Sequence, residues 1–364
     1  MDKNSGYKSA LSVHKGVEQP PNVNPDVITH LRKNKRKKYS IDEYIKEILA
    51  GNRTILSQTI TLVESALPDH YDLAQAIVEK CLPYSGNSVR VGITGIPGAG
   101  KSTFIETLGK HVTSKGKKLA VLAIDPSSQQ TRGSILGDKT RMETLSIDPN
   151  AFIRPSPAAG TLGGVARKTR ESIILCEAAG FDTIFVETVG VGQSETTVDS
   201  MVDFFLLLMV AGAGDELQGI KRGIMEMANV IAITKADGLN KMMAENIKAE
   251  FQIALHLVPS SQSGWQPRVL TCSALENIGI EEIWWAITEF INLTVKSGFF
   301  AERRKQQAII RMHDNIAEVL QTSFYTNTEI LKLMPDLERQ LLNGTITSYK
   351  AACKLLDEYF KKQT

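Results

Sequence analysis

A glycine-rich turn sits between an apolar run and an amphipathic stretch in this 364-residue sequence. Residues 95–102 read G-I-P-G-A-G-K-S, which fits the pattern G-x-x-x-x-G-K-[ST]. The apolar run 89–94 comes directly before them and the helical stretch 103–111 directly after. In that position glycines let successive backbone N–H groups curl around phosphate oxygens, and the helix N-terminus adds a partial positive charge. The arrangement predicts a strand, a phosphate-binding loop and a helix, and therefore a nucleoside triphosphate as ligand.

Two side chains of this loop predict how the triphosphate is held. Lys101 supplies a mobile cation between the β- and γ-phosphates, and Ser102 offers its hydroxyl to Mg²⁺. An incidental glycine-rich turn would not need the strand before it and the helix after it. The predicted nucleotide-contacting residues of the loop are Gly95, Pro97, Gly98, Ala99, Gly100, Lys101, Ser102 and Thr103.

Continuous apolar runs recur along the middle of the chain. Such runs, unlike the alternating pattern of half-exposed strands, are typical of parallel strands with helices on each side. We therefore expect an α/β protein with a mostly parallel sheet, helices on both faces, and N-terminal and C-terminal helical extensions. The predicted strands are 89–94, 119–124, 183–187, 204–210, 230–234 and 269–272.

The segments outside the predicted sheet differ from it in composition. Residues 1–38 hold nine Lys or Arg against three acids, in a chain whose net charge is only +2. This segment is interpreted as a disordered basic arm, a solvated tail rather than a nucleic-acid contact. A helical extension is predicted over 39–87, the α/β domain over 88–295 and three helices over 296–364. The amphipathic stripe of the last segment fits two interpretations, packing against its own domain or a dimerisation arm.

Cysteine usage and hydropathy bear on the compartment. The four cysteines stand far apart and form no metal-binding pattern, which favours reduced thiols packed as small apolar side chains. The longest apolar run, 204–211, is far shorter than the roughly 20 residues of a membrane-spanning helix. The first thirty residues lack the apolar core of a signal peptide. We therefore expect a cytoplasmic protein without membrane contact.

Two later strand ends carry residues suited to a guanine base. The strand 230–234 runs into Thr234-Lys235-Ala236-Asp237. A carboxylate there can accept hydrogen bonds from the ring N–H and exocyclic amine of guanine, a donor pair that adenine lacks. Lys235 can lay its stem along the base plane, and the main chain of Ser273-Ala274-Leu275, after the next strand, would hold the base from the other side. Asp237 alone could be an ordinary turn residue, but the two elements together favour guanine.

Further strand ends predict the remainder of the phosphate site. Glu187 closes the third predicted strand, where Mg²⁺ is usually held directly or through water, and Gly190 would let its N–H approach the γ-phosphate. Asp125 follows the second predicted strand, and Asp138 lies in the polar loop after it as a candidate second Mg²⁺ carboxylate. The glycine-rich segment 212–221 follows the most apolar strand and is a switch candidate.

These blocks together resemble the MeaB/ArgK family of P-loop GTPases, part of a wider group of metallochaperone GTPases. The resemblance runs from about residue 40 to 360. Its members chaperone adenosylcobalamin-dependent acyl-CoA mutases, notably methylmalonyl-CoA mutase. Thr234 stands where the more general motif N-K-x-D has Asn, so we expect this loop to be braced differently. The matching blocks are G-I-P-G-A-G-K-S-T, D-P-S-S, G-S-I-L-G-D-K-T-R-M, R-P-S-P, E-T-V-G-V-G-Q-S-E, G-D-E-L-Q-G-I-K-R-G and T-K-A-D.

The resemblance implies a role for each motif. Lys101 and Ser102 would bind phosphate and Mg²⁺, while Lys235 and Asp237 would read guanine. The segment 212–223 would be the family's third switch, which communicates with the mutase, and the C-terminal helices would be a homodimer arm. The implied sets are Asp125, Asp138, Glu187 and Ser102 for Mg²⁺, Lys101, Glu187, Asp138 and Lys221 for catalysis, and Asp215, Glu216, Gln218 and Lys221 for the partner.

The resemblance thus implies a Mg²⁺-dependent enzyme that hydrolyses GTP to GDP and gates cofactor loading or protection of a mutase. Adenosylcobalamin would be handled only indirectly, through that partner. The compartment would be the cytoplasm, or the mitochondrial matrix in a eukaryote, with no nucleic-acid or membrane partner. Two other functions stay open. One is a P-loop kinase of a small molecule or transport protein, which needs a base near the γ-phosphate. The other is a nucleotide-gated scaffold with negligible turnover.

Overall fold

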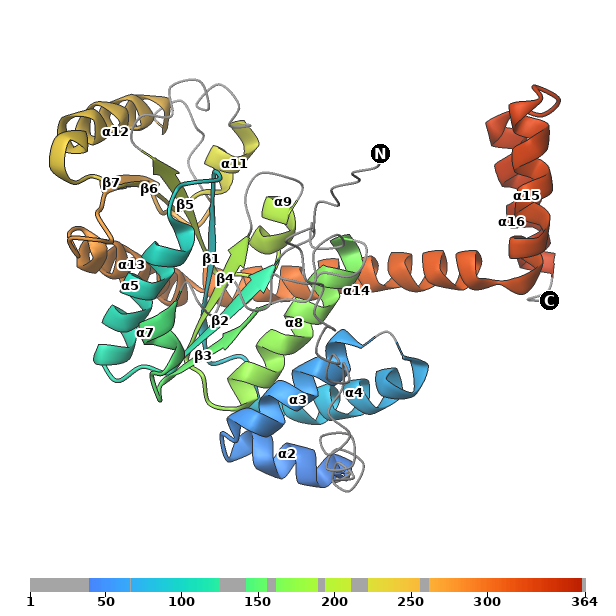
Figure 1. Ribbon diagram of the computed structural model, residues 1–364, viewed down its shortest axis with the longest axis horizontal. Coiled ribbons are helices and arrows are strands. Elements are labelled where there is room, and N and C mark those ends of the chain that lie inside the picture. The colour runs from blue at the N-terminus through green and yellow to red at the C-terminus, as the bar shows by residue number, and fades with distance from the viewer. Residues whose placement is uncertain are drawn as a thin grey trace, which may run out of the picture. The chain divides into compact units, whose positions relative to one another are not determined.

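A seven-stranded sheet forms the centre of the chain in the computed structural model (Figure 1). Every strand pair is parallel, in the order β3-β2-β4-β1-β5-β6-β7. The strands are β1 Val89–Gly95, β2 Leu119–Ile124, β3 Ala151–Arg154, β4 Thr183–Thr188, β5 Phe204–Val210, β6 Val230–Thr234 and β7 Arg268–Thr271. The structure describes residues 39–65, 67–124, 142–155, 162–188, 194–210, 222–255 and 262–361.

The predicted α/β fold with a parallel sheet is confirmed, and its apolar runs form the core. β2 and β4 are buried along their whole length, and β5 along all but its last residue. Burying each large apolar side chain contributes roughly 1.5–3 kcal/mol, so these strands supply a large share of the apolar core. Sequence analysis missed β3, because this edge strand has only four residues and ends in two half-buried positions, Ile153 and Arg154.

Helices cover both faces of the sheet, as predicted. α5 (Lys101–Ser114) and α13 (Ile280–Ser297) pack together on one face, and α8 (Leu162–Ala178) and α9 (Ser194–Asp199) lie on the other. α9 approaches β1 so closely that a Cβ on Gly92 would stand 2.8 Å from the Val198 side chain. The remaining helices of this part are α7 Glu143–Ser146, α11 Arg222–Met227 and α12 Lys241–Leu255.

The strand register gathers the predicted site residues at one edge of the sheet. β1 lies between β4 and β5, and its Ile93 pairs with Glu187 on β4 and with Leu206 on β5. The carboxyl ends of parallel strands share one edge, where open α/β sheets bind their ligands. The turn after β1, the carboxylate of Glu187 and the loop after β6 therefore meet there.

Helical segments precede and follow the sheet, as predicted. The helices α3 and α4 of the first group pack against α8, and α14 begins against α8 and α13. The boundaries predicted for these segments as separate domains stay predictions, and the predicted basic arm 1–38 lies outside the described residues. The helices are α2 Ile41–Leu49, α3 Arg53–Glu64, α4 Pro68–Cys81, α14 Phe299–Thr326, α15 Thr328–Leu342 and α16 Ser348–Lys361.

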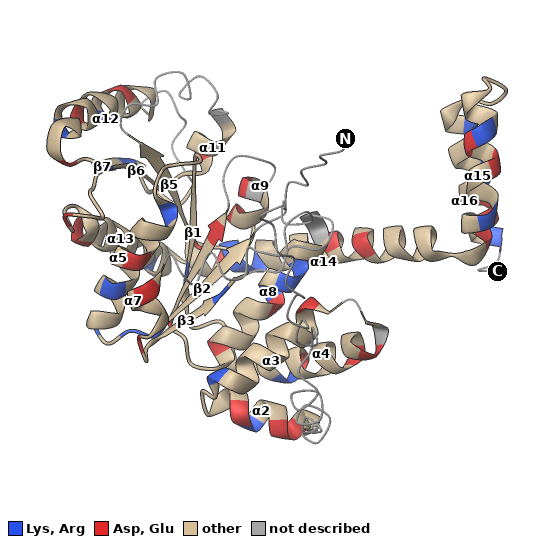
Figure 2. Cartoon of the chain, viewed as in Figure 1, with Lys and Arg blue, Asp and Glu red and all other residues tan. Residues whose placement is uncertain are grey.

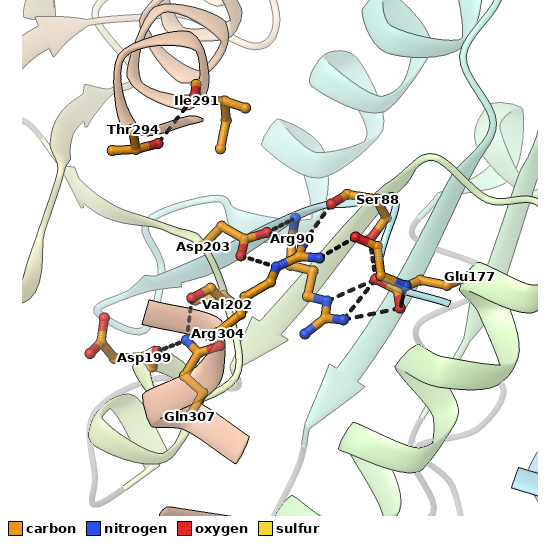
Figure 3. A network of polar contacts seen from close by, with 11 residues as sticks. Ser88, Arg90, Glu177, Asp199, Val202, Asp203, Ile291, Thr294, Arg304 and Gln307 are labelled. Carbon is orange, nitrogen blue, oxygen red and sulfur yellow. Dashed lines mark hydrogen bonds and ion pairs between the residues drawn. The ribbon is translucent and has the colours of Figure 1, made fainter. Parts of the chain in front are cut away.

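A buried ion-pair network fastens α14 to the amino ends of β1 and β5 (Figure 3). Arg304 donates to both oxygens of Asp203, at 2.8 and 2.7 Å, and to the Ser88 carbonyl at 2.7 Å. Asp203 also accepts from the backbone N–H of Arg90, whose guanidinium makes two hydrogen bonds to Glu177 on α8. Burial alone would raise the pKa of Glu177, but Arg90 and the neighbouring N–H and O–H donors hold it below its usual value. The network joins α14, α8 and both strands.

The state of the thiols agrees with the sequence analysis. All four cysteines are free, three are buried, and Cys353 is half-buried. Burial raises the pKa of Cys81 to about 11 and that of Cys272 to about 12, so these thiols are poor nucleophiles at neutral pH. Among the described helices, none combines the length and the apolar composition that a membrane crossing requires.

Candidate nucleotide site

The turn after β1 presents a row of backbone N–H groups. Gly98 and Gly100 adopt φ values of +79° and +78°, which other residues rarely tolerate. Gly95 has no room for a side chain, since a Cβ there would stand 2.4 Å from the Leu208 carbonyl oxygen of β5. In the part of the chain that the structure describes, no backbone acceptor takes the N–H groups of Gly98, Gly100, Lys101, Ser102 and Thr103. This arrangement suits a polyphosphate anion.

Lys101 places its ammonium group across this turn. Its Nζ donates to the carbonyl oxygens of Gly95, at 2.9 Å, and of Ile96, at 3.2 Å. Burial lowers the pKa of Lys101, and the carboxylates of Glu187 and Glu195 act in the opposite direction. A positive charge that has lost part of its hydration gains more from an anionic ligand than an exposed lysine would.

Two oxygen ligands face each other beside the turn. The Ser102 hydroxyl donates to Oε1 of Glu187 across 3.4 Å, and Glu187 is only 7% exposed. Hydroxyl and carboxylate oxygens are the ligands that Mg²⁺ prefers, so this pair fits such an ion. Within the described ranges no three His, Cys, Asp or Glu side chains cluster as a metal site of their own.

The two loops predicted to read guanine are joined to each other. The Ser273 hydroxyl donates to Oδ2 of Asp237 at 2.6 Å, and the Ala236 N–H donates to the Cys272 carbonyl at 3.0 Å. Lys235 has a φ of +56°, and its Cε lies 3.9 Å from where Gly100 would carry a Cβ. The lysine stem therefore runs beside the phosphate turn, where it could also flank a base.

Thr234 braces this loop with a hydroxyl instead of an amide. Its Oγ1 lies 2.8 Å from the Ala99 carbonyl of the phosphate turn and 2.8 Å from the Met209 carbonyl of β5. Thr234 is 5% exposed, so its side chain supports the site from beneath. The different bracing that was expected from T-K-A-D is therefore these two contacts of the Thr234 hydroxyl.

The structure brings together only part of the predicted residue set. Lys101, Ser102, Glu187 and Asp237 lie at one sheet edge, and Leu275 is 81% exposed in its loop. Asp125, Asp138, Gly190, Asp215, Glu216, Gln218 and Lys221 lie outside the described residues.

Sequence reasoning missed two residues at this edge. Glu195 on α9 is 2% exposed and attracts the Lys101 ammonium. Its signal was its place at the end of the run E-T-V-G-V-G-Q-S-E. The second residue, Thr107 on α5, hydrogen-bonds to Ala274 and had no local signal.

A parallel sheet with a phosphate turn after its central strand and a T-K-A-D loop two strands away defines a P-loop protein of the GTPase class. The model of the family described as methylmalonyl-CoA mutase-associated GTPase MeaB matches residues 56–329. The chain belongs to this MeaB family, as its sequence blocks predicted.

Named relatives agree with this assignment. A probable GTPase of Mycobacterium tuberculosis is 46% identical over 87% of this chain and 95% of its own length. The GTPase ArgK of Escherichia coli is 44% identical over 89% of this chain and 98% of its own length. The mouse protein named methylmalonic aciduria type A homolog, mitochondrial, is 45% identical over 88% of this chain and 79% of its own length.

A solved structure shares the fold. The crystal structure titled LAO/AO transport system kinase superposes with a TM-score of 0.71, at 38% identity, over 89% of this chain and all of that one. The chain is an enzyme of the MeaB family that hydrolyses GTP, as the names of its relatives support.

Proposed function

We propose that this GTPase is a nucleotide-operated chaperone of an adenosylcobalamin-dependent acyl-CoA mutase, with methylmalonyl-CoA mutase as the first candidate. The observation that carries the proposal is the family match, whose description names that mutase and which spans the whole nucleotide site. The name of the mouse relative, methylmalonic aciduria type A homolog, supports the same partner. The partner would hold the cobalamin, and this chain would act on loading or protection of the cofactor only through it.

Each of the site residues described above has a part in this proposal. The N–H groups of the phosphate turn hold the triphosphate, and Lys101 leaves its two carbonyl partners to neutralise the β- and γ-phosphates. Ser102 and Glu187 would hold Mg²⁺, which neutralises charge on the phosphates when bound. Asp237, oriented by Ser273, accepts the two N–H donors of guanine.

The switch roles fall mainly on segments outside the described residues. The proposal assigns γ-phosphate sensing to 125–141 and 188–195, including Asp125, Asp138 and Gly190, and partner contact to 212–223. A ligand changes a partner's state only through different affinities for two conformations, so these segments must differ between the GTP and GDP states. Without a partner, turnover should be slow, on the order of 10⁻⁴ to 10⁻² s⁻¹.

Phosphate release measured with and without methylmalonyl-CoA mutase tests the proposal. We expect a mutase that binds the GTP-bound form to accelerate release, and Lys101→Ala to lose nucleotide binding or turnover. Equal rates with and without any cobalamin mutase, together with no copurification under a GTP analogue, would overturn it. Negligible turnover in both conditions would point to the scaffold function instead.

A kinase function is the second candidate, because the solved relative carries that word in its title. The Asp237 and Ser273 pair argues against ATP as the phosphate donor, because adenine has no donor pair for that carboxylate. Competition between GTP and ATP separates the two functions. Strong use of ATP with transfer to an acceptor would establish the kinase.

We also propose that α14 is a self-association surface. A groove of about 530 Å³ lies along it, lined by Arg311, Met312, Asn315, Ile316, Val319 and Leu320 among others. Beyond Glu318 this helix has no charged residue, as Figure 2 shows. The apolar side chains of this stretch are about half exposed, which favours a covering partner.

The groove also contains a half-buried charge, that of Arg311. Its Nε is buried and has no hydrogen-bond acceptor among the residues that the structure describes. Burial and the neighbouring Arg170 and Arg90 lower the pKa of Arg311 to about 10. A carboxylate from a second copy would offset the free-energy cost of burying this charge.

We place the protein in the cytoplasm, or in the mitochondrial matrix of a eukaryote, as the compartments where such a mutase works.

A further inference from the structure

Thr107 joins the phosphate-binding helix to the base-binding loop. It lies on α5, six residues after Lys101, and its hydroxyl is 3.0 Å from the Thr103 carbonyl of its own helix. The same hydroxyl is 3.1 Å from the Ala274 carbonyl in the loop 273–278. A hydroxyl has one hydrogen to donate, so the tertiary acceptor competes directly with the helical one.

The loop 273–278 closes upon itself, and its Ser273 hydroxyl also donates to Asp237 in the loop after β6. Ser273 and Ile278 exchange backbone hydrogen bonds of 2.9 and 3.0 Å, and the Glu276 N–H donates to the Ser273 hydroxyl. A Cβ on Gly279 would stand 2.2 Å from the Thr271 carbonyl oxygen, which keeps the loop exit tight. The loop therefore has a fixed shape. The Asp237 contact ties its start to the loop after β6, and the Thr107 contact ties its tip to α5.

The N–H groups of the loop tip are available for a ligand. Within the residues that the structure describes, neither Ala274 nor Leu275 donates its N–H to another backbone group. The Ala274 carbonyl and the Leu275 N–H belong to one planar peptide unit. Fixing the oxygen from the Thr107 side therefore fixes the direction in which that N–H points.

We propose that Thr107 is a positioning residue for base selection. It holds the 274–275 peptide at a set distance from α5, the helix whose first turn carries Lys101 and Ser102. The base and the phosphates of one nucleotide then meet groups that are held in a fixed relation. The inference rests on the proposed guanine site and deepens it, because Thr107 touches neither base nor phosphate itself.

The chain offers matched variants for the test. Thr107→Val keeps the branched shape but removes the hydroxyl, and Thr107→Ser keeps the hydroxyl. Thr288 on α13 is the control, because among the described residues its hydroxyl bonds only to the carbonyls of Trp284 and Trp285 in its own helix. Thr288→Val thus removes a helical hydrogen bond without touching the site.

The measurement is calorimetric affinity for GDP, ADP and pyrophosphate, each with Mg²⁺. We expect Thr107→Val to weaken GDP binding roughly three- to tenfold, the ordinary worth of one hydrogen bond, and to leave pyrophosphate binding unchanged. The ratio of GDP to ADP affinity should fall by the same factor. Thr107→Ser and Thr288→Val should stay within about twofold of the parent chain.

Two outcomes would overturn the inference. One is an unchanged GDP affinity in Thr107→Val. The other is an equal loss of GDP and pyrophosphate affinity, which would show a general effect on α5. The variant Asp237→Asn distinguishes failure of the Thr107 inference from failure of the proposed guanine site. If it removes guanine preference while Thr107→Val does not, the guanine site stands and Thr107 has no part in it. If Asp237→Asn changes nothing, the guanine site itself is wrong and the inference falls with it.

Discussion

Burial destabilises the charged form of Lys101, and this gives nucleotide binding a characteristic pH dependence. Burial lowers the pKa of Lys101, so the free protein loses this proton at a lower pH than an exposed lysine does. A bound triphosphate would raise the same pKa by attraction. Affinity for GTP should therefore be constant at neutral pH and begin to fall at an alkaline pH below 10.5.

Binding titrations from pH 7 upward check this, with Lys101→Arg as the control. Arginine stays charged throughout the range, so its affinity, although lower, should not fall with pH. A parallel fall in both proteins would assign the pH dependence to another group.

Gly95 is sterically fixed, which predicts a sharp difference between two glycine substitutions. Gly95→Ala would drive a Cβ into the Leu208 carbonyl of the neighbouring strand, so β1 and β5 would have to separate. We expect a loss of roughly 1–3 kcal/mol in the free energy of unfolding. Gly223→Ala on α11 has open space and should be neutral or slightly stabilising. Denaturant titrations of both variants measure this difference in the free energy of unfolding. A Gly95→Ala variant as stable as the parent chain would contradict the structure.

Local chemistry made part of the site predictable from sequence. The phosphate turn could be read residue by residue, because its glycines, Lys101 and Ser102 stand within one short motif whose backbone needs are known. The contact between Thr107 and Ala274 joins positions 167 apart, and no local pattern signals it. The bracing by Thr234 was only half predictable. The substitution is visible in sequence, but its carbonyl partners depend on how two loops pack.

At the level of elements, the network under α14 is predicted to be a major source of stability. Arg304→Met would leave the buried carboxylate of Asp203, which is 2% exposed, without its guanidinium partner. Removing one partner of a buried pair typically costs about 3–5 kcal/mol. Lys305→Met is the control, since Lys305 is exposed and, within the described ranges, pairs only with the exposed Glu302 of its own helix, at 3.7 Å.

Thermal and denaturant unfolding of both variants test this. Arg304→Met should lower the midpoint strongly and Lys305→Met hardly at all. Equal stabilities of the two variants would show that the network contributes specificity of docking rather than free energy.

The sheet was predictable to the extent that its strands are buried on both sides. The sequence of β5, F-F-L-L-L-M-V, is apolar at every position, which is typical of a central strand covered on both faces. β3 and α8 left weaker signals, because β3 is a short edge strand and α8 carries buried polar residues such as Arg170 and Glu177. Those polar groups are buried only because distant partners satisfy them, and that pairing is a property of the tertiary structure.

Across the molecule, the two ends of β1 and β5 serve different purposes. Their carboxyl ends lead into the phosphate turn and the predicted switch segment, while their amino ends are tied to α14 through Asp203 and Arg90. Arg303 on α14 also bonds to Asp199 at the end of α9, at 2.7 Å. The long helix is therefore fastened to the elements that carry the nucleotide site, which fits an arm that responds together with that site.

The final prediction concerns α14 as an interface between two copies. Ile316, Val319 and Leu320 are each about half exposed, and the helix carries no charged residue beyond Glu318, so we expect the protein to dimerise through this face. Val319→Glu with Leu320→Glu would bury two charges and should give a monomer in sedimentation analysis. Ile253→Asp on α12, an apolar position that is still more exposed, should leave the dimer intact.

Basal GTP turnover should survive the double substitution, because these residues lie on a helix remote in sequence from the phosphate turn and form no part of the proposed site. A monomeric parent chain at micromolar concentration would refute the interface. A dimer that persists in the double variant would show that the interface lies on another surface of the protein. A monomer that has also lost GTP binding would show that the arm and the site cannot be separated, because folding of the one depends on the other.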